Sequence, residues 1–196
     1  MENDKLKIDF CEFSKESACY IIEPSDIPNI DLYMDQVTTF METKLSGYKR
    51  NDQDKILTKT MINNYAKAKL FPSPIKKKYT KNHVMLLIII YHLKNMLSIN
   101  DIGHITAPVT KELAENPDSK ILEKIYSIFV LMQKAVYNSA DKRQVFDSEF
   151  FSSYINDEEI KSKKEYVSIV CVLGFSVFSN MEKRLSEKII DSIQQI

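Results

Sequence analysis

A chain of 196 residues, 44% of them hydrophobic, can bury a substantial core, which excludes a disordered polypeptide. Lysine plus arginine (27) balances aspartate plus glutamate (27), which excludes a strong net field as the basis of binding. The balance is local: residues 41–96 hold 12 basic and three acidic side chains, and the remainder holds 15 and 24. A polyanion-binding module attached to an acidic remainder has this asymmetry, and so does a solvated basic surface without a partner.

The compartment is indicated by the cysteines and the apolar stretches. Cys11, Cys19 and Cys171 form no C-x-x-C pair, and we interpret them as reduced thiols. The N-terminus MENDKLKIDF is charged and lacks the apolar run of a signal peptide. The longest apolar stretches are shorter than the roughly 20 residues that cross a bilayer. The sequence therefore predicts a cytoplasmic protein with no membrane partner.

Helices are expected nearly everywhere, because three glycines are too few for tightly turned sheets. The helices predicted in the first half cover 31–46, 58–68 and 80–96, followed by a short one after Ser98. The first has its apolar stripe at Tyr33, Val37, Phe40, Met41 and Leu45. Thr58, Thr80 and Ser98 are the expected N-caps. Between the second and third helices, Pro72 and Pro74 block helix continuation, and residues 75–79 are expected to form a short, wing-like strand.

The second half is predicted to be a helical bundle that begins near Ala107-Pro108. Its expected helices are 109–115, one opened by Asn116-Pro117 and ending near 137, a short one in 147–155, and a last, longest one. Asn156 and Glu159 resemble a capping box that opens the last helix, and Gly174 marks a possible bend in it. The prediction is thus an all-α fold with a small wing.

The helix predicted at 58–68 has one strongly polar face. At about 100° per residue, the outward side carries Lys59, Thr60, Asn63, Asn64 and Lys67, and the opposite side is apolar. Asparagine is a mediocre helix former, so two adjacent ones are a small local cost. Asparagine can bind the major-groove edge of adenine, and lysine can bind guanine or phosphate. An ordinary exposed helix face is the alternative interpretation.

The order of elements favours the DNA interpretation. A helix, a second helix with a polar face, a basic connection and a third helix is the order of a winged helix-turn-helix. In that arrangement Lys76, Lys77, Lys78 and Lys81 contact phosphates, which positions the protein without reading base sequence.

The segment INNYAKAKLFPSPIKKKYTKNHVMLLIII resembles the MerR-type winged-helix domain. The family has a Leu-Arg-x-Tyr core in its recognition helix, then Gly-Leu-Leu-Pro, and a wing that ends in Arg-x-Tyr-Ser. The matching scaffold positions are Ile62, Tyr65, Leu70, Pro72, Tyr79, Thr80, Val84 and Leu87. Two positions depart from the pattern: Asn63 replaces a DNA-contacting arginine, and Lys69 replaces a glycine.

A second resemblance covers more of the chain. The segments 27–45 and 56–102 are similar to the bacterial YkrK-like family of uncharacterised proteins. That resemblance implies a winged helix-turn-helix in a cytoplasmic regulator, and it implies no ligand, operator or regulated process.

The sequence contains none of the common enzyme motifs. His83, His92 and His104 lack the spacing of a zinc site, and His83 and His92 are expected at the surface or half buried. There is no nucleophile elbow and no phosphate-binding or dinucleotide-binding loop. The sequence therefore predicts no enzyme activity, no metal and no cofactor.

The resulting hypothesis has three segments: an N-terminal segment (1–27), a winged helix-turn-helix domain (28–106) and a helical region for dimerisation or sensing (107–196). Its function would be sequence-specific binding of double-stranded DNA by a homodimer, hence transcriptional regulation, with an unknown effector ligand. The predicted DNA contacts are Lys59, Thr60, Asn63, Asn64, Lys67, Lys76, Lys77, Lys78 and Lys81. The alternative is a protein-interaction module that keeps the scaffold without binding DNA.

Overall fold

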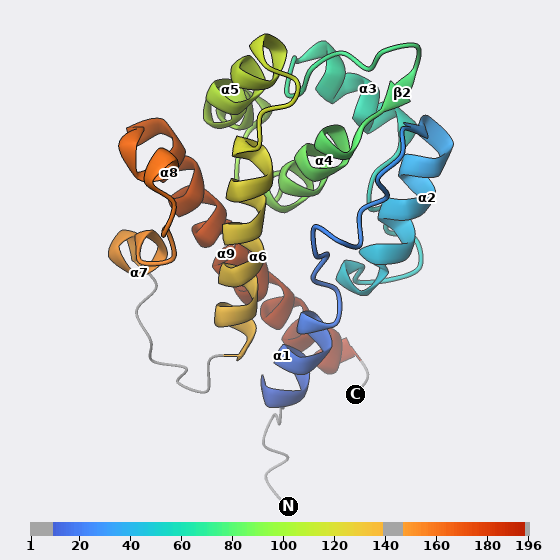
Figure 1. Cartoon of the computed structure of the whole chain (residues 1–196). Coiled ribbons are helices and arrows are strands. Elements are labelled where there is room, and N and C mark those ends of the chain that lie inside the picture. Colours follow the sequence, from blue (N-terminus) through green and yellow to red (C-terminus); the bar gives the residue numbers. More distant parts are fainter. Residues whose placement is uncertain (1–9, 139–146, 195–196) are drawn as a thin grey trace, which may run out of the picture.

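The computed structural model describes residues 10–138 and 147–194, and within these ranges it is mostly α-helical, as predicted (Figure 1). The helices are α1 (Phe10–Ala18), α2 (Met34–Lys44), α3 (Lys59–Lys67), α4 (Lys81–Leu93), α5 (Ile99–Glu115), α6 (Ile121–Asn138), α7 (Ser148–Ser152), α8 (Glu158–Ser162) and α9 (Lys164–Gln194). A 3-10 helix, η1 (Ser46–Tyr48), follows α2, and two strands, β1 (Leu32–Tyr33) and β2 (Lys78–Tyr79), complete the described elements. None of the described helices is long and apolar enough to span a membrane.

The capping residues of the first half begin the helices where the sequence predicts them. The Thr58 hydroxyl accepts a hydrogen bond from the Met61 backbone N–H at 3.2 Å, which caps α3. Ser98 caps α5 in the same way, through the Asp101 N–H. The first predicted helix, in contrast, begins three residues late. Tyr33 belongs to β1 and is 55% exposed, so it is not part of the buried stripe of α2.

Residues 75–78 form a tight hairpin turn, which we call the lysine turn. The Lys78 N–H donates to the Ile75 carbonyl at 2.9 Å, and both intervening residues have positive φ, 51° at Lys76 and 63° at Lys77. Positive φ at both central positions defines a type I′ turn, which normally carries Asn-Gly because side chains are strained there. β2 leaves this turn and pairs antiparallel with β1, with Tyr33 opposite Lys78. The strand predicted at 75–79 is therefore present only at Lys78–Tyr79, because the residues before it form the turn, and its partner comes from the segment before α2.

The C-terminus of α3 contains a third strained lysine. Lys69 has φ 58°, its N–H donates to the Ala66 carbonyl, and the Leu70 N–H donates to the Tyr65 carbonyl, both at 3.0 Å. This pair of hydrogen bonds is a Schellman motif, in which glycine is the usual residue. The buried Leu70 and Tyr65 side chains complete it. The motif ends α3 and directs the chain toward the lysine turn, although a lysine occupies the position at which glycine is usual.

The boundaries predicted for the second half were wrong at α5, at α6 and at the last helix. α5 continues through Pro108, because its buried stripe of Ile102, Thr106, Val109 and Leu113 extends on both sides of the proline. α6 begins at Ile121, after a turn that contains Pro117, so Asn116-Pro117 does not open it.

The last predicted helix is divided in two. Asp157, not Asn156, is the N-cap, and it opens the short helix α8; the chain is extended at Lys163 before α9 begins. Gly174 lies inside α9 and has a packing role. A Cβ added there would lie 2.3 Å from the Phe151 ring, so the missing side chain lets α7 pack closely on α9.

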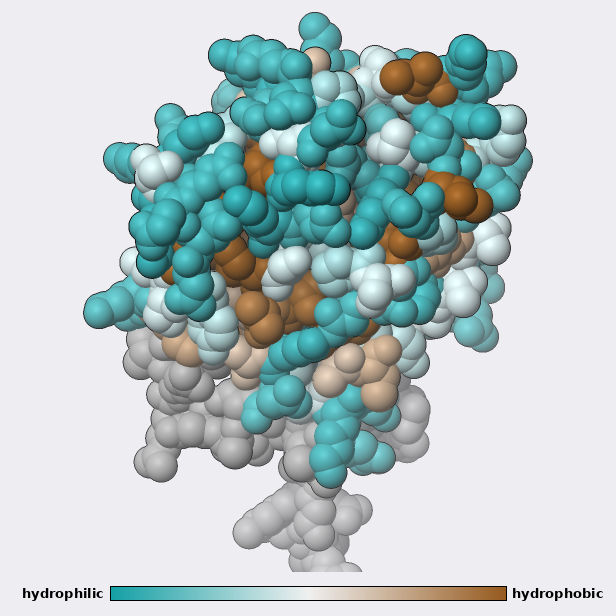
Figure 2. Space-filling view, in the orientation of Figure 1, coloured by the Kyte–Doolittle hydropathy of each residue, from teal (hydrophilic) through white to brown (hydrophobic). Residues whose placement is uncertain are grey.

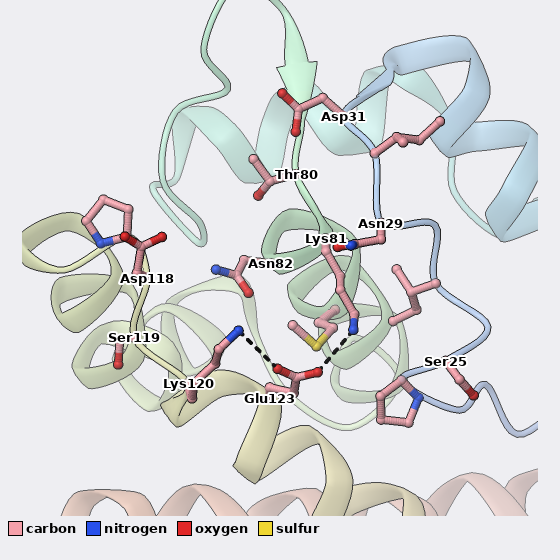
Figure 3. Close-up of a pocket in the computed structure, with 15 residues that line it drawn as sticks. Ser25, Asn29, Asp31, Thr80, Lys81, Asn82, Asp118, Ser119, Lys120 and Glu123 are labelled. Atoms are coloured by element: carbon pink, nitrogen blue, oxygen red, sulfur yellow. Dashed lines mark hydrogen bonds and ion pairs between the residues drawn. The ribbon is translucent and has the colours of Figure 1, made fainter.

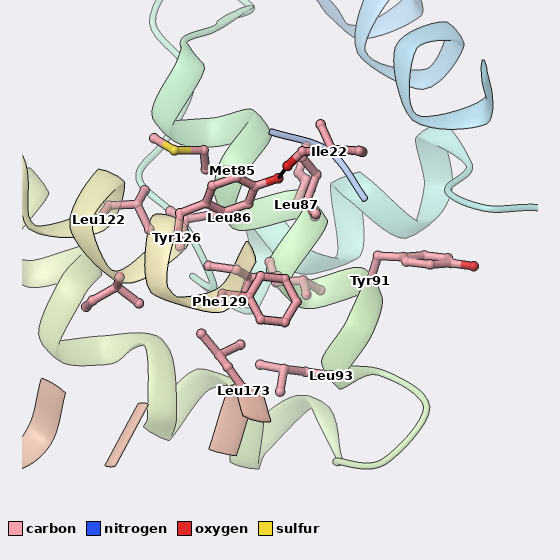
Figure 4. Packing of buried hydrophobic residues seen from close by; sticks show 14 of the residues in the cluster. Ile22, Met85, Leu86, Leu87, Tyr91, Leu93, Leu122, Tyr126, Phe129 and Leu173 are labelled. Carbon is pink, nitrogen blue, oxygen red and sulfur yellow. Dashed lines mark hydrogen bonds between the residues drawn. The ribbon is translucent and has the colours of Figure 1, made fainter. Parts of the chain in front are cut away.

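The hydrophobic core is centred on α4, whose residues 83–93 are all buried and which packs against α6, α9 and β2 (Figure 4). Phe129 of α6 and Leu173 of α9 extend the cluster from the other side. The buried Tyr126 hydroxyl donates to the Ile22 carbonyl at 2.8 Å, which holds the N-terminal segment against α6. The helix that follows the lysine turn is thus also the central helix of the whole described fold.

Candidate nucleic-acid interface

One side of α3 is exposed and polar, as the 100° spacing predicts. The exposed residues of this α3 polar face are Lys59, Thr60, Asn63, Asn64 and Lys67. Ile62 and Tyr65, on the opposite side, are 0% and 6% exposed, and α3 packs on α2. Among the described residues, the side-chain amides of Asn63 and Asn64 make no hydrogen bond within the protein. Their donors and acceptors are free to bind a partner.

The lysine turn, which follows α3 along the chain, is also exposed. Lys76 and Lys77 are exposed at its tip, and the Lys78 ammonium lies 5.6 Å from the centre of the Tyr33 ring. α3 and the lysine turn lie at the same end of the molecule, away from α7 and α8 (Figure 1). The space-filling view shows that this upper part of the surface is mostly hydrophilic with small hydrophobic patches (Figure 2).

Several lysines of this region make no ion pair, as is also true of Lys15, Lys55 and Lys164 elsewhere in the described ranges. Within the described ranges, the side chains of Lys67, Lys69, Lys76 and Lys77 make no ion pair. Elsewhere pairing is frequent: Lys44 binds Asp26, Lys124 binds Asp157 and Glu159, and Lys188 binds Glu16. Ammonium groups that bind no carboxylate within the protein are available to an external anion.

His83 fastens the lysine-turn segment to α4. Its Nδ1 accepts from the Thr80 backbone N–H at 3.0 Å, so Nε2 carries the proton and donates to the Pro72 carbonyl at 2.9 Å. The bonded residues lie on either side of the lysine turn. The ring is 6% exposed, and burial lowers the pKa of His83. His83 and His92 were predicted at the surface or half buried; both are buried, which corrects that expectation.

Two of the predicted DNA contacts have partners inside the protein. Lys59 forms an ion pair with Asp35 at the start of α2. Lys81 binds Glu123 of α6 at 3.0 Å, and Lys120 approaches the same carboxylate at 3.7 Å (Figure 3). The hydrogen bond from Lys81 lowers the pKa of Glu123. The structure therefore places Lys81 in a different site from the α3 polar face.

That different site is a polar cavity of about 560 Å³ between the segment before α2 and the first turns of α4 and α6. Asn29, Asp31, Asn82 and Asp118 line it together with the Lys81–Glu123 pair (Figure 3). Neither the α3 polar face nor the tip of the lysine turn lines this cavity or the other main pockets in the described ranges. No group of three or more metal-binding side chains occurs among the described residues.

Sequence reasoning missed three residues of this region. Ile75 is 74% exposed at the first position of the lysine turn, Tyr33 is half exposed against Lys78, and His83 joins both ends of the turn segment. The signal for His83 was its position three residues after Thr80, the third helical position, from which a side chain can reach back to the N-cap. No pattern in the sequence predicts the pairing of β1 with β2, which joins segments 45 residues apart.

The geometry defines a mostly α-helical protein in which a short helix and an adjoining basic turn present unpartnered polar groups. The chain belongs to the family described as Domain of unknown function (DUF1836), whose model matches residues 22–129. That range covers α2, α3, the lysine turn and α4, and it continues across the boundary predicted at residue 106 into α6. No curated protein and no solved structure matches the chain.

Proposed function

We propose that this protein is a cytoplasmic, sequence-specific DNA-binding regulator in which residues 28–106 form a MerR-like winged helix-turn-helix related to the YkrK-like proteins. The observation that carries the proposal is the α3 polar face, whose exposed amides have no partner in the described ranges. The order of α2, α3, the paired lysine turn and α4 supports it.

The residues have different roles in this proposal. Asn63 and Asn64 read base edges in the major groove, because an amide can donate and accept in one plane. Lys67, Lys76 and Lys77 contact phosphates and set the register. Lys59 is partly neutralised by Asp35, so its contribution is smaller, and Lys81 acts indirectly by joining α4 to α6.

The experiment that tests the proposal is a salt titration. The purified protein is titrated against a fluorescent, randomised duplex pool between about 50 and 200 mM salt. We expect the logarithm of the affinity to fall linearly with the logarithm of salt concentration, because phosphate contacts release counterions. Selection from the same pool then yields an operator, on which Asn64→Ala is expected to cost about 1 to 3 kcal/mol of discrimination at one base pair. A folded protein that binds no duplex at low salt contradicts the proposal.

We propose that the protein binds DNA as a homodimer. The two protomers pair through the C-terminal end of α9. Ile189, Ile190 and Ile193 lie on one stripe of the helix and are 37%, 45% and 64% exposed. One recognition helix makes few base contacts, so a two-fold dimer is needed to reach an affinity typical of specific sites.

The dimer is tested by light scattering at micromolar concentration. Wild type is expected to be dimeric, and the Ile190→Glu/Ile193→Glu variant monomeric with weaker binding to the selected duplex, because buried carboxylates repel and desolvate unfavourably. Ile99→Glu, which places one carboxylate at a 46% exposed isoleucine of α5, is the control and is expected to remain dimeric. Monomeric wild type would overturn the assignment.

A protein-interaction module is the second candidate, and one observation favours it. An apolar groove of about 590 Å³ lies between α5 and α9, lined by Met96, Leu97, Ile105, Val172 and the 37% exposed Phe175. Exposed apolar surface rimmed by polar groups is typical of binding sites. The salt titration separates the candidates, since an interaction module that does not use DNA shows no salt-dependent binding of duplexes.

A further inference from the structure

The lysine turn carries an exposed apolar side chain at its first position. Ile75 is 74% exposed, the highest value among the exposed large hydrophobic side chains of the described residues. It is followed directly by Lys76 and Lys77, and its carbonyl accepts the hydrogen bond that closes the turn. A single exposed isoleucine is ordinary, but this one is the first residue of a closed turn whose two central residues are exposed lysines.

The turn is held rigidly enough to place that side chain. The Ile75–Lys78 bridge closes the hairpin, and β2 pairs with β1 on the other side. His83 binds the Pro72 carbonyl before the turn and the Thr80 N–H after it. Both ends of the segment are therefore fixed to α4, and little conformational entropy is lost when the tip meets a partner.

We propose that Ile75 is a wedge that enters the minor groove beside the bound major groove, partly unstacks one base step and kinks the DNA. This inference rests on the proposed function. Isoleucine is among the residues that proteins insert between base pairs, and the kinks that result are roughly 20–90°. Lys76 and Lys77 bind the phosphates on either side of the opened step, which neutralises the strands where they approach each other.

The wedge predicts a sequence preference at a position that no hydrogen bond reads. Burying one isoleucine gives a free energy of the same order as unstacking one base step. The balance is therefore favourable only where unstacking is easy, as at TA and CA steps, and unfavourable in stiff A-tracts. The duplex that the protein selects should carry a pyrimidine–purine step under the lysine turn.

The test measures bending and binding separately on the duplex selected from the random pool. End-to-end energy transfer reports the bend for wild type, Ile75→Ala and Ile75→Phe, and for the control Ile30→Ala, which truncates another exposed isoleucine (67%). We expect Ile75→Ala to bind with less than half of the wild-type bend and without the preference for TA over AA. Ile75→Phe and Ile30→Ala should keep both. Thermal unfolding is expected to be unchanged in all, since these side chains are exposed.

The outcomes separate the two proposals. Equal bending by wild type and Ile75→Ala overturns the wedge and leaves DNA binding standing. A straight duplex in the wild-type complex overturns the wedge as well. Failure of wild type to bind any duplex overturns DNA binding, and the wedge with it. If Ile75→Ala binds every sequence more weakly by the same factor and bends the duplex as wild type does, Ile75 contributes to affinity and its role in kinking is rejected.

Discussion

Between pH 7.5 and pH 4.5 the free energy of unfolding is expected to fall by roughly 2 to 3 kcal/mol through His92 alone. The ring is 2% exposed and packs edge-on against Tyr48, Tyr91 and Phe129, with centroid distances of 5.2–5.6 Å. Burial, with repulsion from Arg184 and Lys94, lowers the pKa of His92 to about 3. Between that value and the ordinary pKa near 6.5, the unfolded chain binds a proton that the folded chain refuses, so stability is complete above about pH 6.5 and is lost below it. The lowered pKa of His83 acts in the same direction.

Urea unfolding across pH 4.5–7.5 measures this effect in wild type, His92→Leu and His104→Asn. The leucine variant should lose less stability on acidification, by roughly 2 to 3 kcal/mol over the range, whatever its packing costs at pH 7.5. His104 is exposed, so His104→Asn should follow the wild-type curve. The range stops at pH 4.5 because carboxylates with lowered pKa values, such as Asp26, contribute at lower pH. Parallel curves for wild type and His92→Leu would show that the folded ring accepts a proton and that His92 is not the group responsible.

Local patterns predicted the starts of α3, α4 and α5 because local forces determine them. Thr58, Thr80 and Ser98 begin helices since each side chain satisfies a backbone N–H within its own first turn. The phase of α3 followed from its apolar residues, which is why the exposed positions of the polar face were predicted correctly.

The errors arose where tertiary packing outweighs a local signal. Pro108 removes one helical hydrogen bond, but Ile102 and Val109 are buried on either side of it, and their burial keeps α5 continuous. Lys59 and Lys81 look like equivalent free cations in the sequence, yet Asp35 and Glu123 reach them from other helices. The partner of a charge, like the partner of β2, is a property of the fold.

The two lysines with positive φ in the lysine turn give the sharpest test of function. Replacing Lys76-Lys77 by Asn-Gly supplies the residues that a type I′ turn favours, so we expect an increase of about 1–2 kcal/mol in the free energy of unfolding. The same change removes two unpaired charges. If both contact phosphates, the slope of log affinity against log salt becomes shallower by about 1.8. A variant that equals wild type in affinity at 1 M salt would then bind roughly 60-fold more weakly than wild type at 0.1 M.

The opposite signs make this result decisive. A variant that binds DNA weakly because it is partly unfolded is less stable, whereas this one is expected to be more stable and to bind less. Lys111→Ala/Lys161→Ala removes the same number of charges from α5 and α8, where each lysine already pairs with a neighbouring glutamate, and its slope should equal that of wild type. If the variant is more stable and its salt slope is unchanged, the lysine turn does not bind phosphate. The predicted outcome explains why strained lysines occupy a turn that Asn-Gly would stabilise: strain is tolerated at a functional site when the charged side chains are needed there.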